Sequence, residues 1–366
     1  MTAREMKALP PGSTIGILGG GQLGRMLALA AARLGLKCHI YSDVAGPAFD
    51  VAARSMVGAF EDVEKIAAFA RAVDVVTYEF ENVPLAAAAA AQRHAPVRPG
   101  PRALAASQDR LEEKRFIETL GIPVAPFAAI ATDGDFAGAV AVTGEKAILK
   151  TRRLGYDGKG QARIASGAEL AGAFAAIGRR PAVLEGFVPF EYEVSVLVVR
   201  GLGGDVRFYD VPLNTHKAGI LDTSTVPSPL SAAHVAKATA IAREIAVALD
   251  YVGLLAVEMF YVGAEAAEPF VVNEMAPRVH NSGHWTMDAC VVSQFENHMR
   301  AVAGWPLGPT DRHSDAVMTN LIGSDVEAWQ RLAGEGTALH LYGKPDARPG
   351  RKMGHVNRIS PKRSCT

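Results

Sequence analysis

Residues 273–286 read Asn-Glu-Met-Ala-Pro-Arg-Val-His-Asn-Ser-Gly-His-Trp-Thr and follow the apolar run 269–272, Pro-Phe-Val-Val. A short apolar run of this kind is typical of a buried strand. The residues that follow it carry a carboxylate, an arginine, two histidines, two amides and two hydroxyls. Burying so many polar groups costs free energy unless each one finds a partner. We therefore expect this strand to end at a metal ion and an anionic ligand.

A second acidic residue is spaced to meet this stretch. Residues 254–262 alternate, so that Glu258 lies on the opposite face of a strand from its apolar neighbours. The short connection 263–268 indicates a hairpin that brings Glu258 and Glu274 to one face of a sheet. Adjacent carboxylates in a partly buried site repel each other strongly unless a cation lies between them. We expect Mg²⁺, a hard ion that takes carboxylate and phosphate oxygens.

The two histidines of the stretch argue against zinc. His280 and His284 are four residues apart, but they follow Pro277 in a segment that contains glycine and has no helix caps. A zinc pair on one helix face needs a regular helix. We expect structural or substrate-contacting histidines instead.

Composition limits the classes of protein. A chain of 366 residues is long enough for two or three domains. Lys and Arg (38) balance Asp and Glu (38), so the basic footprint of a nucleic-acid or membrane-surface binder is missing. Three scattered cysteines, Cys38, Cys290 and Cys365, favour a reducing, cytoplasmic compartment. We expect neither a leader peptide nor a membrane span.

The N-terminal part predicts a strand, a glycine turn and a helix. An apolar strand over 13–18 runs into Gly-Gly-Gly-Gln-Leu-Gly at 19–24, and helical periodicity follows over 25–34. The spacing satisfies the dinucleotide fingerprint, and Asp43 follows the next strand, 37–41, where a ribose-binding acid would lie. That pattern favours an NAD enzyme. Free amides at a helix N-terminus hold any phosphate, however, so a phosphorylated substrate fits equally well.

Polar residues also follow the third predicted strand, 73–77. The sequence Tyr-Glu-Phe-Glu-Asn-Val-Pro at 78–84 places Glu79 and Glu81 where open α/β sheets bind ligands. Solvated loop carboxylates are the alternative.

A helix is predicted over 107–120, with Ser107 as its N-cap. It places Arg110 and Lys114 one turn apart on one face. They form either a phosphate-binding pair or a solvated basic surface.

The middle of the chain changes to short strands. Strands over 147–150 and 161–164 enclose Thr-Arg-Arg-Leu-Gly-Tyr-Asp-Gly-Lys-Gly at 151–160, with more glycine than a plain hairpin needs. Such a loop can fold over phosphates with its amides and cations. The strand 183–188 ends in Glu-Gly-Phe-Val, which could line an adenine pocket.

Four cations fall within ten residues at 343–352, between two predicted C-terminal strands. They form either a solvated turn or a clamp for a phosphomonoester.

Together these motifs carry a resemblance that covers nearly the whole chain. Residues 19–26, 78–83, 155–161 and 273–286 are similar to those of the N5-carboxyaminoimidazole ribonucleotide synthetases, ATP-grasp ligases that serve as the ATPase subunit of bacterial phosphoribosylaminoimidazole carboxylase. The resemblance implies α/β and α+β parts in three units. These are a Rossmann-like, pre-ATP-grasp substrate-binding domain over 1–119, a lid subdomain over 120–188, and a mixed catalytic domain over 189–366 that ends in a small β subdomain.

The resemblance also implies the site residues. The ATP site falls on Arg110, Lys150, Gly155, Tyr156, Asp157, Gly158, Lys159, Gly160, Gln161, Glu185, Gly186, Phe187, Val188, Glu193, His216, Asn273 and Glu274. The magnesium ligands fall on Glu258 and Glu274. The ribonucleotide site falls on Gln22, Glu79, Tyr156, Asp157, Arg278, His280, Asn281, Ser282, Lys344, Arg351 and Lys352. Asp157, Arg278 and His280 are the catalytic candidates, Arg278 beside bicarbonate and the other two to orient or deprotonate the substrate amine.

The implied chemistry has two steps and belongs to de novo purine biosynthesis. ATP, with two magnesium ions, phosphorylates the co-substrate bicarbonate to carboxyphosphate. The exocyclic amine of aminoimidazole ribonucleotide then attacks the carbonyl carbon or the carbon dioxide released from it. The resemblance further implies a cytoplasmic homodimer whose product is used by a separate mutase, with no nucleic-acid or membrane partner.

Three other functions compete with this one. An NAD-dependent oxidoreductase would use the first glycine motif but would leave Glu258 and Glu274 unexplained. A formate-using glycinamide ribonucleotide transformylase would share the ATP-grasp architecture. A nucleotide-binding regulator would show little or no turnover.

Overall fold

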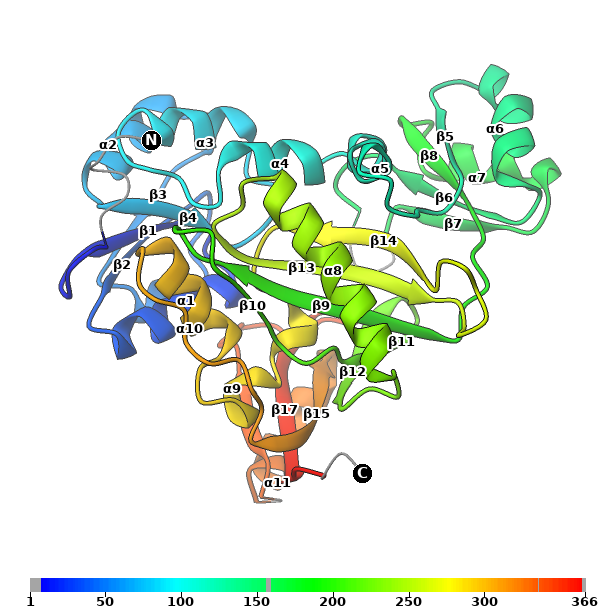
Figure 1. The fold of residues 1–366 in the computed structure, drawn as a ribbon. Coiled ribbons are helices and arrows are strands. Elements are labelled where there is room, and N and C mark those ends of the chain that lie inside the picture. The colour runs from blue at the N-terminus through cyan, green and yellow to red at the C-terminus, as the bar shows by residue number, and fades with distance from the viewer. Residues whose placement is uncertain (1–7, 156–158, 335, 364–366) are drawn as a thin grey trace.

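The structure is a computed structural model and describes residues 8–155, 159–334 and 336–363. Its strands form three sheets. Figure 1 shows the N-terminal sheet at one end, a small sheet at the other, and a large sheet between and below them. The large sheet therefore meets both of the others.

The N-terminal sheet is parallel throughout, with the order β3-β2-β1-β4. Its strands are β1 (Thr14–Leu18), β2 (Lys37–Ser42), β3 (Arg54–Val57) and β4 (Val75–Tyr78). The helices that connect or follow them are α1 (Gln22–Arg33), α2 (Val63–Arg71), α3 (Leu85–Gln92), α4 (Pro101–Ser107) and α5 (Arg110–Thr119), with a 3-10 turn at Phe49–Val51. The apolar strands β1 and β4 are buried because α1 packs on one face of the sheet and α2 and α3 pack on the other.

One predicted helix start was wrong. Asp109, not Ser107, caps α5, and its side chain accepts the Leu111 N–H at 3.1 Å. Ser107 instead ends α4, where its hydroxyl donates to the Ala103 carbonyl at 2.9 Å. A serine hydroxyl can bond either a backbone N–H of the helix that follows it or a backbone carbonyl of the preceding turn, and Ser107 bonds the carbonyl.

The small sheet is antiparallel, with the order β5-β8-β6-β7. Its strands are β5 (Phe127–Ile130), β6 (Ala147–Thr151), β7 (Gln161–Ile164) and β8 (Ala182–Gly186), covered by α6 (Phe136–Thr143) and α7 (Leu170–Ala176) with 3-10 turns at Asp133–Asp135 and Gly167–Glu169. The predicted hairpin around the glycine-rich loop is confirmed by the pairing of Ala147 with Ile164.

The large sheet has the order β14-β13-β9-β11-β12-β15-β17-β16, with β10 beside β9. Its strands are β9 (Tyr192–Arg200), β10 (Val206–Phe208), β11 (Leu213–Lys217), β12 (Ile220–Val226), β13 (Gly253–Tyr261), β14 (Phe270–Ala276), β15 (Ser314–Ile322), β16 (Ala338–Leu341) and β17 (Lys352–Pro361). The helices are α8 (Ala232–Ala248), α9 (Thr286–Ala289), α10 (Gln294–Val302) and α11 (Trp329–Gly334), with 3-10 turns at Asn281–Gly283 and Gly323–Ala328.

Alternation along β13 builds two cores from one strand. Leu254 and Ala256 join the core that includes α1 and α10, whereas Leu255 and Val257 join the core beneath α8. Successive strand side chains point to opposite faces, so a strand covered on both sides is apolar almost throughout. The exception is Glu258, which pairs in register with Glu274 of β14. The predicted hairpin is therefore confirmed.

No helix of the described residues is long and apolar enough to cross a membrane. The domain boundaries at 119/120 and 188/189 stay predictions.

The two-sided burial of β13 predicts a matched pair of stability effects. Leu254 and Leu255 are both fully buried, so changing either to alanine should lower the free energy of unfolding by about 2–5 kcal/mol. Leu29, on α1, is 45 % exposed, and L29A should cost less than about 0.5 kcal/mol. Urea unfolding followed by circular dichroism measures all three. If either β13 variant lost as little free energy of unfolding as L29A, the face of the sheet that carries the substituted leucine would not be part of a core.

Candidate active site

A cavity of about 1250 Å³ lies where the three sheets meet. Its wall takes Glu79 and Glu81 from the loop after β4, Lys150 from β6, and Glu258 and Glu274 from the β13–β14 hairpin. Strand ends and loops from all three sheets thus contribute polar groups to one space.

The structure brings most of the predicted site residues together. Those on the cavity wall are Gln22, Glu79, Arg110, Lys150, Gly155, Lys159, Gln161, Glu185, Gly186, Phe187, Val188, Glu193, His216, Glu258, Asn273, Glu274, Arg278, His280, Asn281, Lys344, Arg351 and Lys352. Ser282 lies behind the wall and is fully buried. Gly160 is also off the wall, and its φ of +73° serves the turn before β7. Tyr156, Asp157 and Gly158 lie outside the described residues.

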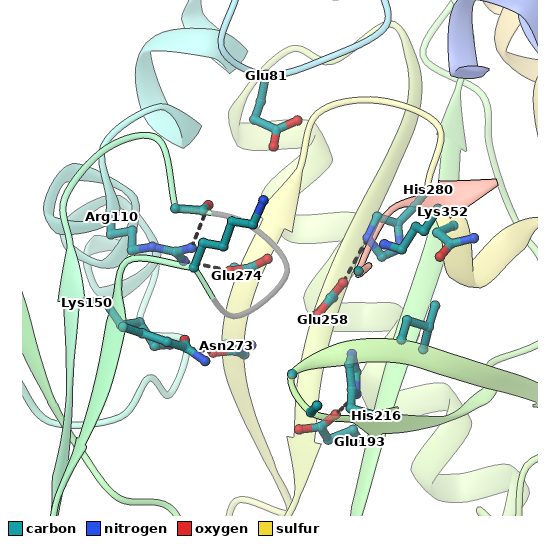
Figure 2. A pocket seen from close by; sticks show the side chains of 18 of the residues that line it. Glu81, Arg110, Lys150, Glu193, His216, Glu258, Asn273, Glu274, His280 and Lys352 are labelled. Carbon is teal, nitrogen blue, oxygen red and sulfur yellow. Dashed lines mark hydrogen bonds and ion pairs between the residues drawn. The ribbon is translucent and has the colours of Figure 1, made fainter. Parts of the chain in front are cut away.

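The paired carboxylates each have a basic partner. Arg110 Nη1 is 2.6 Å from Glu274 Oε2, and His280 Nε2 is 2.9 Å from Glu258 Oε1. Figure 2 shows the two glutamates on neighbouring strands, one turned to each partner. Burial alone would raise the pKa of Glu274, but Arg110 and Lys150 lower it to about 2. Glu274 is therefore a fixed negative charge at neutral pH.

Two lysines share a single buried carboxylate beside this pair. Lys150 Nζ is 3.0 Å and Lys114 Nζ 3.1 Å from Glu185 Oε2, and both lysines also reach Asn273. Burial works against the charge of Glu185, yet Lys150 and Lys114 hold its pKa below the ordinary range. Lys150 lines the cavity, whereas Lys114 is fully buried. Lys150 can therefore leave Glu185 for a ligand anion without leaving that carboxylate unpaired.

An apolar end lies next to these cations. Ala125, Ile148, Phe187, Phe190 and Phe260 line it, and the rings of Phe190 and Phe260 stack with centroids 4.6 Å apart. The strand predicted over 183–188 ends at Gly186, and a flat, apolar slot beside residues 185–188 suits a purine base. Sequence reasoning did not identify Phe190 and Phe260, because only the sheet brings them together.

At the opposite end Glu79 occupies the glycine turn. Its carboxylate accepts the backbone N–H of Gly21 and, at 2.5 Å, that of Gly24. Burial raises the pKa of Glu79, while these two amides oppose the shift. A dinucleotide pyrophosphate would need the same amides. The glycine motif is therefore already satisfied, which counts against the NAD alternative.

Basic residues complete this end of the cavity. Arg278 donates a hydrogen bond to Glu81. The sequence had allowed Glu81 to be either a ligand-binding residue or a solvated loop carboxylate. Lys344, Arg351 and Lys352 line the wall as predicted, and Arg348, which was not predicted individually, lines it too. Lys344 Nζ donates to the Lys352 carbonyl at 2.6 Å, so these residues are held close together. This arrangement suits a phosphomonoester.

His284 lines the cavity from a buried position. It is fully buried, and its Nδ1 lies 3.1 Å from Asn281 Nδ2 and 3.2 Å from the Tyr342 hydroxyl. Burial holds its pKa well below the ordinary range. A neutral histidine in this position orients Asn281, which lines the cavity.

A small lid sheet and a larger sheet that enclose a cation-lined cavity beside an N-terminal α/β unit define an ATP-grasp enzyme. Three family models match successive parts of the chain: the ribonucleotide synthetase preATP-grasp domain over residues 12–108, the ATP-grasp domain over 115–295, and the phosphoribosylaminoimidazole carboxylase C-terminal domain over 316–365. The predicted fold class is therefore confirmed.

Individual relatives indicate which family of ATP-grasp enzymes the chain resembles. An N5-carboxyaminoimidazole ribonucleotide synthase of Brucella melitensis is 53 % identical over 98 % of this chain and 99 % of its own. The crystal structure of the synthetase from Thermus thermophilus superposes with a TM-score of 0.88 at 47 % identity, covering 94 % of this chain and 93 % of that one. The Aspergillus clavatus enzyme in complex with ADP and 5-aminoimidazole ribonucleotide superposes with a TM-score of 0.89 at 30 % identity, covering 96 % and 94 %.

The chain belongs to the N5-carboxyaminoimidazole ribonucleotide synthase family. The members of this family are ATP-grasp ligases that carboxylate aminoimidazole ribonucleotide in purine biosynthesis. The predicted family, the enzyme class and ATP-dependent carboxylation of aminoimidazole ribonucleotide are confirmed.

A buried acid under the hairpin yields a pH-dependent prediction. Glu113 accepts the Met275 N–H at 2.6 Å, and burial together with the charge of Glu274 raises the pKa of Glu113 to about 8. The folded protein therefore holds a proton that the unfolded chain releases above about pH 4.5, so the contribution of Glu113 to wild-type stability falls as the pH rises toward 8. The variant E113Q keeps the shape of the side chain at position 113 but removes its ionisable carboxyl group. Its stability relative to wild type should rise between pH 5 and 8, by at most about 1.4 kcal/mol per pH unit.

Urea unfolding at pH 5, 6, 7 and 8 measures this difference. E112Q, which removes the same charge from the exposed side of α5, is the control and should track the wild type. Parallel stability curves for E113Q and wild type would contradict a raised pKa at Glu113.

Proposed function

We propose that this protein carboxylates the exocyclic amine of 5-aminoimidazole ribonucleotide with bicarbonate at the expense of ATP. In the first step a bicarbonate oxygen attacks the γ-phosphorus, which gives carboxyphosphate and ADP. In the second step the amine nitrogen bonds to the carbonyl carbon, phosphate leaves, and the amine loses a proton. The observation that carries this proposal is one cavity with an apolar, lysine-flanked end and a basic end on either side of the Glu258–Glu274 pair.

ATP would lie at the apolar end. The purine would lie between residues 185–188 and the Phe190–Phe260 pair. Glu193 and His216, which bond each other, would contact the ribose. Lys150 and Arg110 would neutralise the phosphates. Transfer to bicarbonate is accelerated mainly by positioning and charge neutralisation, because little covalent chemistry is left to the protein.

Glu258 and Glu274 fit magnesium. They offer hard oxygen donors from facing positions of neighbouring strands, and Mg²⁺ takes one or two carboxylates together with phosphate oxygens. Within the described residues no group of three or more His, Cys, Asp or Glu side chains could hold a metal by itself. The other ligands of either predicted ion would therefore come from ATP and water. Bound magnesium would neutralise charge on the transferring phosphoryl group.

The ribonucleotide would lie at the basic end. Lys344, Arg348, Arg351 and Lys352 would bind its phosphate, and Glu79 stands where it can accept ribose hydroxyls. Arg278 is held by Glu81 between this end and the Glu258–Glu274 pair, a suitable place to bind bicarbonate. The ribonucleotide in the Aspergillus clavatus complex supports this substrate.

Carboxyphosphate must be kept from water until the amine reacts. The glycine-rich residues 155–161 remain the predicted lid, and Asp157 remains a candidate for orienting the amine. Homodimer formation, product use by a separate mutase and a cytoplasmic location also stay predictions.

The proposal is tested by ADP release from Mg·ATP with bicarbonate present throughout and the ribonucleotide added or left out. We expect release to rise about tenfold or more on adding the ribonucleotide, because the second substrate completes the closed site. E274Q should lower the stimulated kcat by about 100-fold or more through loss of a charge that positions the metal and Arg110.

E64Q provides a matched control, because it makes the same change on the exposed side of α2 and should leave the rate unaltered. ADP release that ignores the ribonucleotide would contradict the proposed substrate, and formate with glycinamide ribonucleotide would be the next pair to test.

A further inference from the structure

A chain of hydrogen-bonded side chains runs from the cavity wall into the large sheet. His280 Nδ1 is 2.9 Å from Ser282 Oγ, Ser282 Oγ is 2.6 Å from Ser195 Oγ, and Asn214 Nδ2 is 3.0 Å from Ser195 Oγ. Ser224 Oγ donates to Asn214 Oδ1 at 2.8 Å. Ser195 lies opposite Glu258 in the pairing of β9 with β13, so the chain crosses one face of the sheet. We call His280, Ser282, Ser195 and Asn214 the donor chain.

Behind His280, which lines the cavity, the members of the donor chain and the neighbouring Ser224 are buried. Ser195, Ser224 and Ser282 are 0 % exposed and Asn214 is 7 % exposed. Water cannot supply missing partners at such positions, and an unsatisfied buried donor or acceptor is costly. The hydroxyl protons of Ser282 and Ser195 must therefore each point at an acceptor among their buried neighbours.

The carboxylate at the cavity fixes the direction of the chain. His280 Nε2 lies 2.9 Å from Glu258 Oε1, so Nε2 is placed to donate to the cavity, while the Ser282 N–H points at Nδ1. Nδ1 is then bare and must accept. It receives the hydroxyl of Ser282, whose own oxygen receives the hydroxyl of Ser195, whose oxygen receives the amide of Asn214.

A backbone contact gives the same direction independently. The Ser282 N–H points at His280 Nδ1, at 3.4 Å, as the N-cap contact of the 3-10 turn Asn281–Gly283. A proton on Nδ1 would face this N–H. If the order were reversed, Ser195 would also receive two hydrogen bonds and have no acceptor for its own proton among the contacts of the described residues.

We propose that Asn214, Ser195 and Ser282 are positioning residues that keep Nδ1 of His280 an acceptor, so that its ring proton lies on Nε2. Through them His280 presents a hydrogen-bond donor to the cavity, whether the oxygen it meets belongs to Glu258 or to a bound anion. The Asn214 amide is the terminal donor that sets this state from the far side of β9.

This inference refines the proposed function and rests on it for its chemical meaning. A donor fixed at Nε2 can bind an oxygen of bicarbonate or carboxyphosphate as charge develops there. It cannot take the proton of the substrate amine at the same nitrogen. Of the two roles predicted for His280, orientation is therefore retained, and the amine proton leaves to a different group.

The isosteric variant N214D tests the proposal, because it replaces the terminal amide donor with an acceptor. The ligand-free protein is read by long-range ¹H–¹⁵N correlation spectra of its histidine rings, with H280N used to assign the His280 signals. Wild type should show His280 protonated on Nε2 and bare on Nδ1. N214D should place a proton on Nδ1, and its stimulated kcat should fall about tenfold or more with KM for ATP near the wild-type value.

N297D makes the same change at a fully buried amide on α10, away from the donor chain. It should leave the His280 spectrum and the rate per folded molecule unaltered. If N214D does not fold, S195A cuts the chain one residue closer to His280 and should lower kcat in the same way. A wild-type His280 with its proton on Nδ1, or an N214D spectrum identical to wild type, overturns the proposal. The spectrum needs no substrate, so wild-type protein that fails to carboxylate would instead overturn the proposed function.

Discussion

The register pairing of Glu258 with Glu274 is the constraint on which the site depends. Two carboxylates on facing positions of neighbouring strands repel each other, so each needs a cation or a donor of its own. Arg110 of α5 pairs with Glu274, and His280 from the segment after β14 pairs with Glu258. Helix α5 and the segment after β14 therefore meet at this hairpin.

The two ends of the cavity differ because different sheets supply them. The lid sheet brings Lys150 and Glu185 together with apolar neighbours, which gives a place for a nucleotide. The N-terminal sheet and the C-terminal strands bring Glu79 and a cluster of cations, which gives a place for a sugar phosphate. In the proposed reaction the nucleotide gives its γ-phosphoryl group to bicarbonate, and the carboxyl group so activated passes to the sugar phosphate, which places the carboxylate pair between the two ends.

Much of this was predictable from sequence where the signal was local. Alternation along residues 254–262 and the short connection after them predicted the hairpin, and the spacing of Arg110 and Lys114 predicted that they share a face. Features that depend on distant segments were not predictable. Glu79 fills the glycine turn from 55 residues away or more, Phe190 meets Phe260 only through the sheet, and Asn214 reaches His280 only through two buried serines. The N-cap predicted at Ser107 lies at Asp109 instead, since a serine hydroxyl can also bond the turn that precedes it.

Binding of Mn²⁺, used in place of Mg²⁺, tests the central claim that the paired carboxylates and a nucleotide hold a divalent cation together. Electron paramagnetic resonance would follow free Mn²⁺ in titrations of wild type and of the double variant E258Q/E274Q, each with and without ADP. We predict that ADP strengthens Mn²⁺ binding to wild type beyond its binding to ADP alone, and that the double variant loses this gain. An equal gain in the double variant would contradict the account, because the cation would then be held elsewhere.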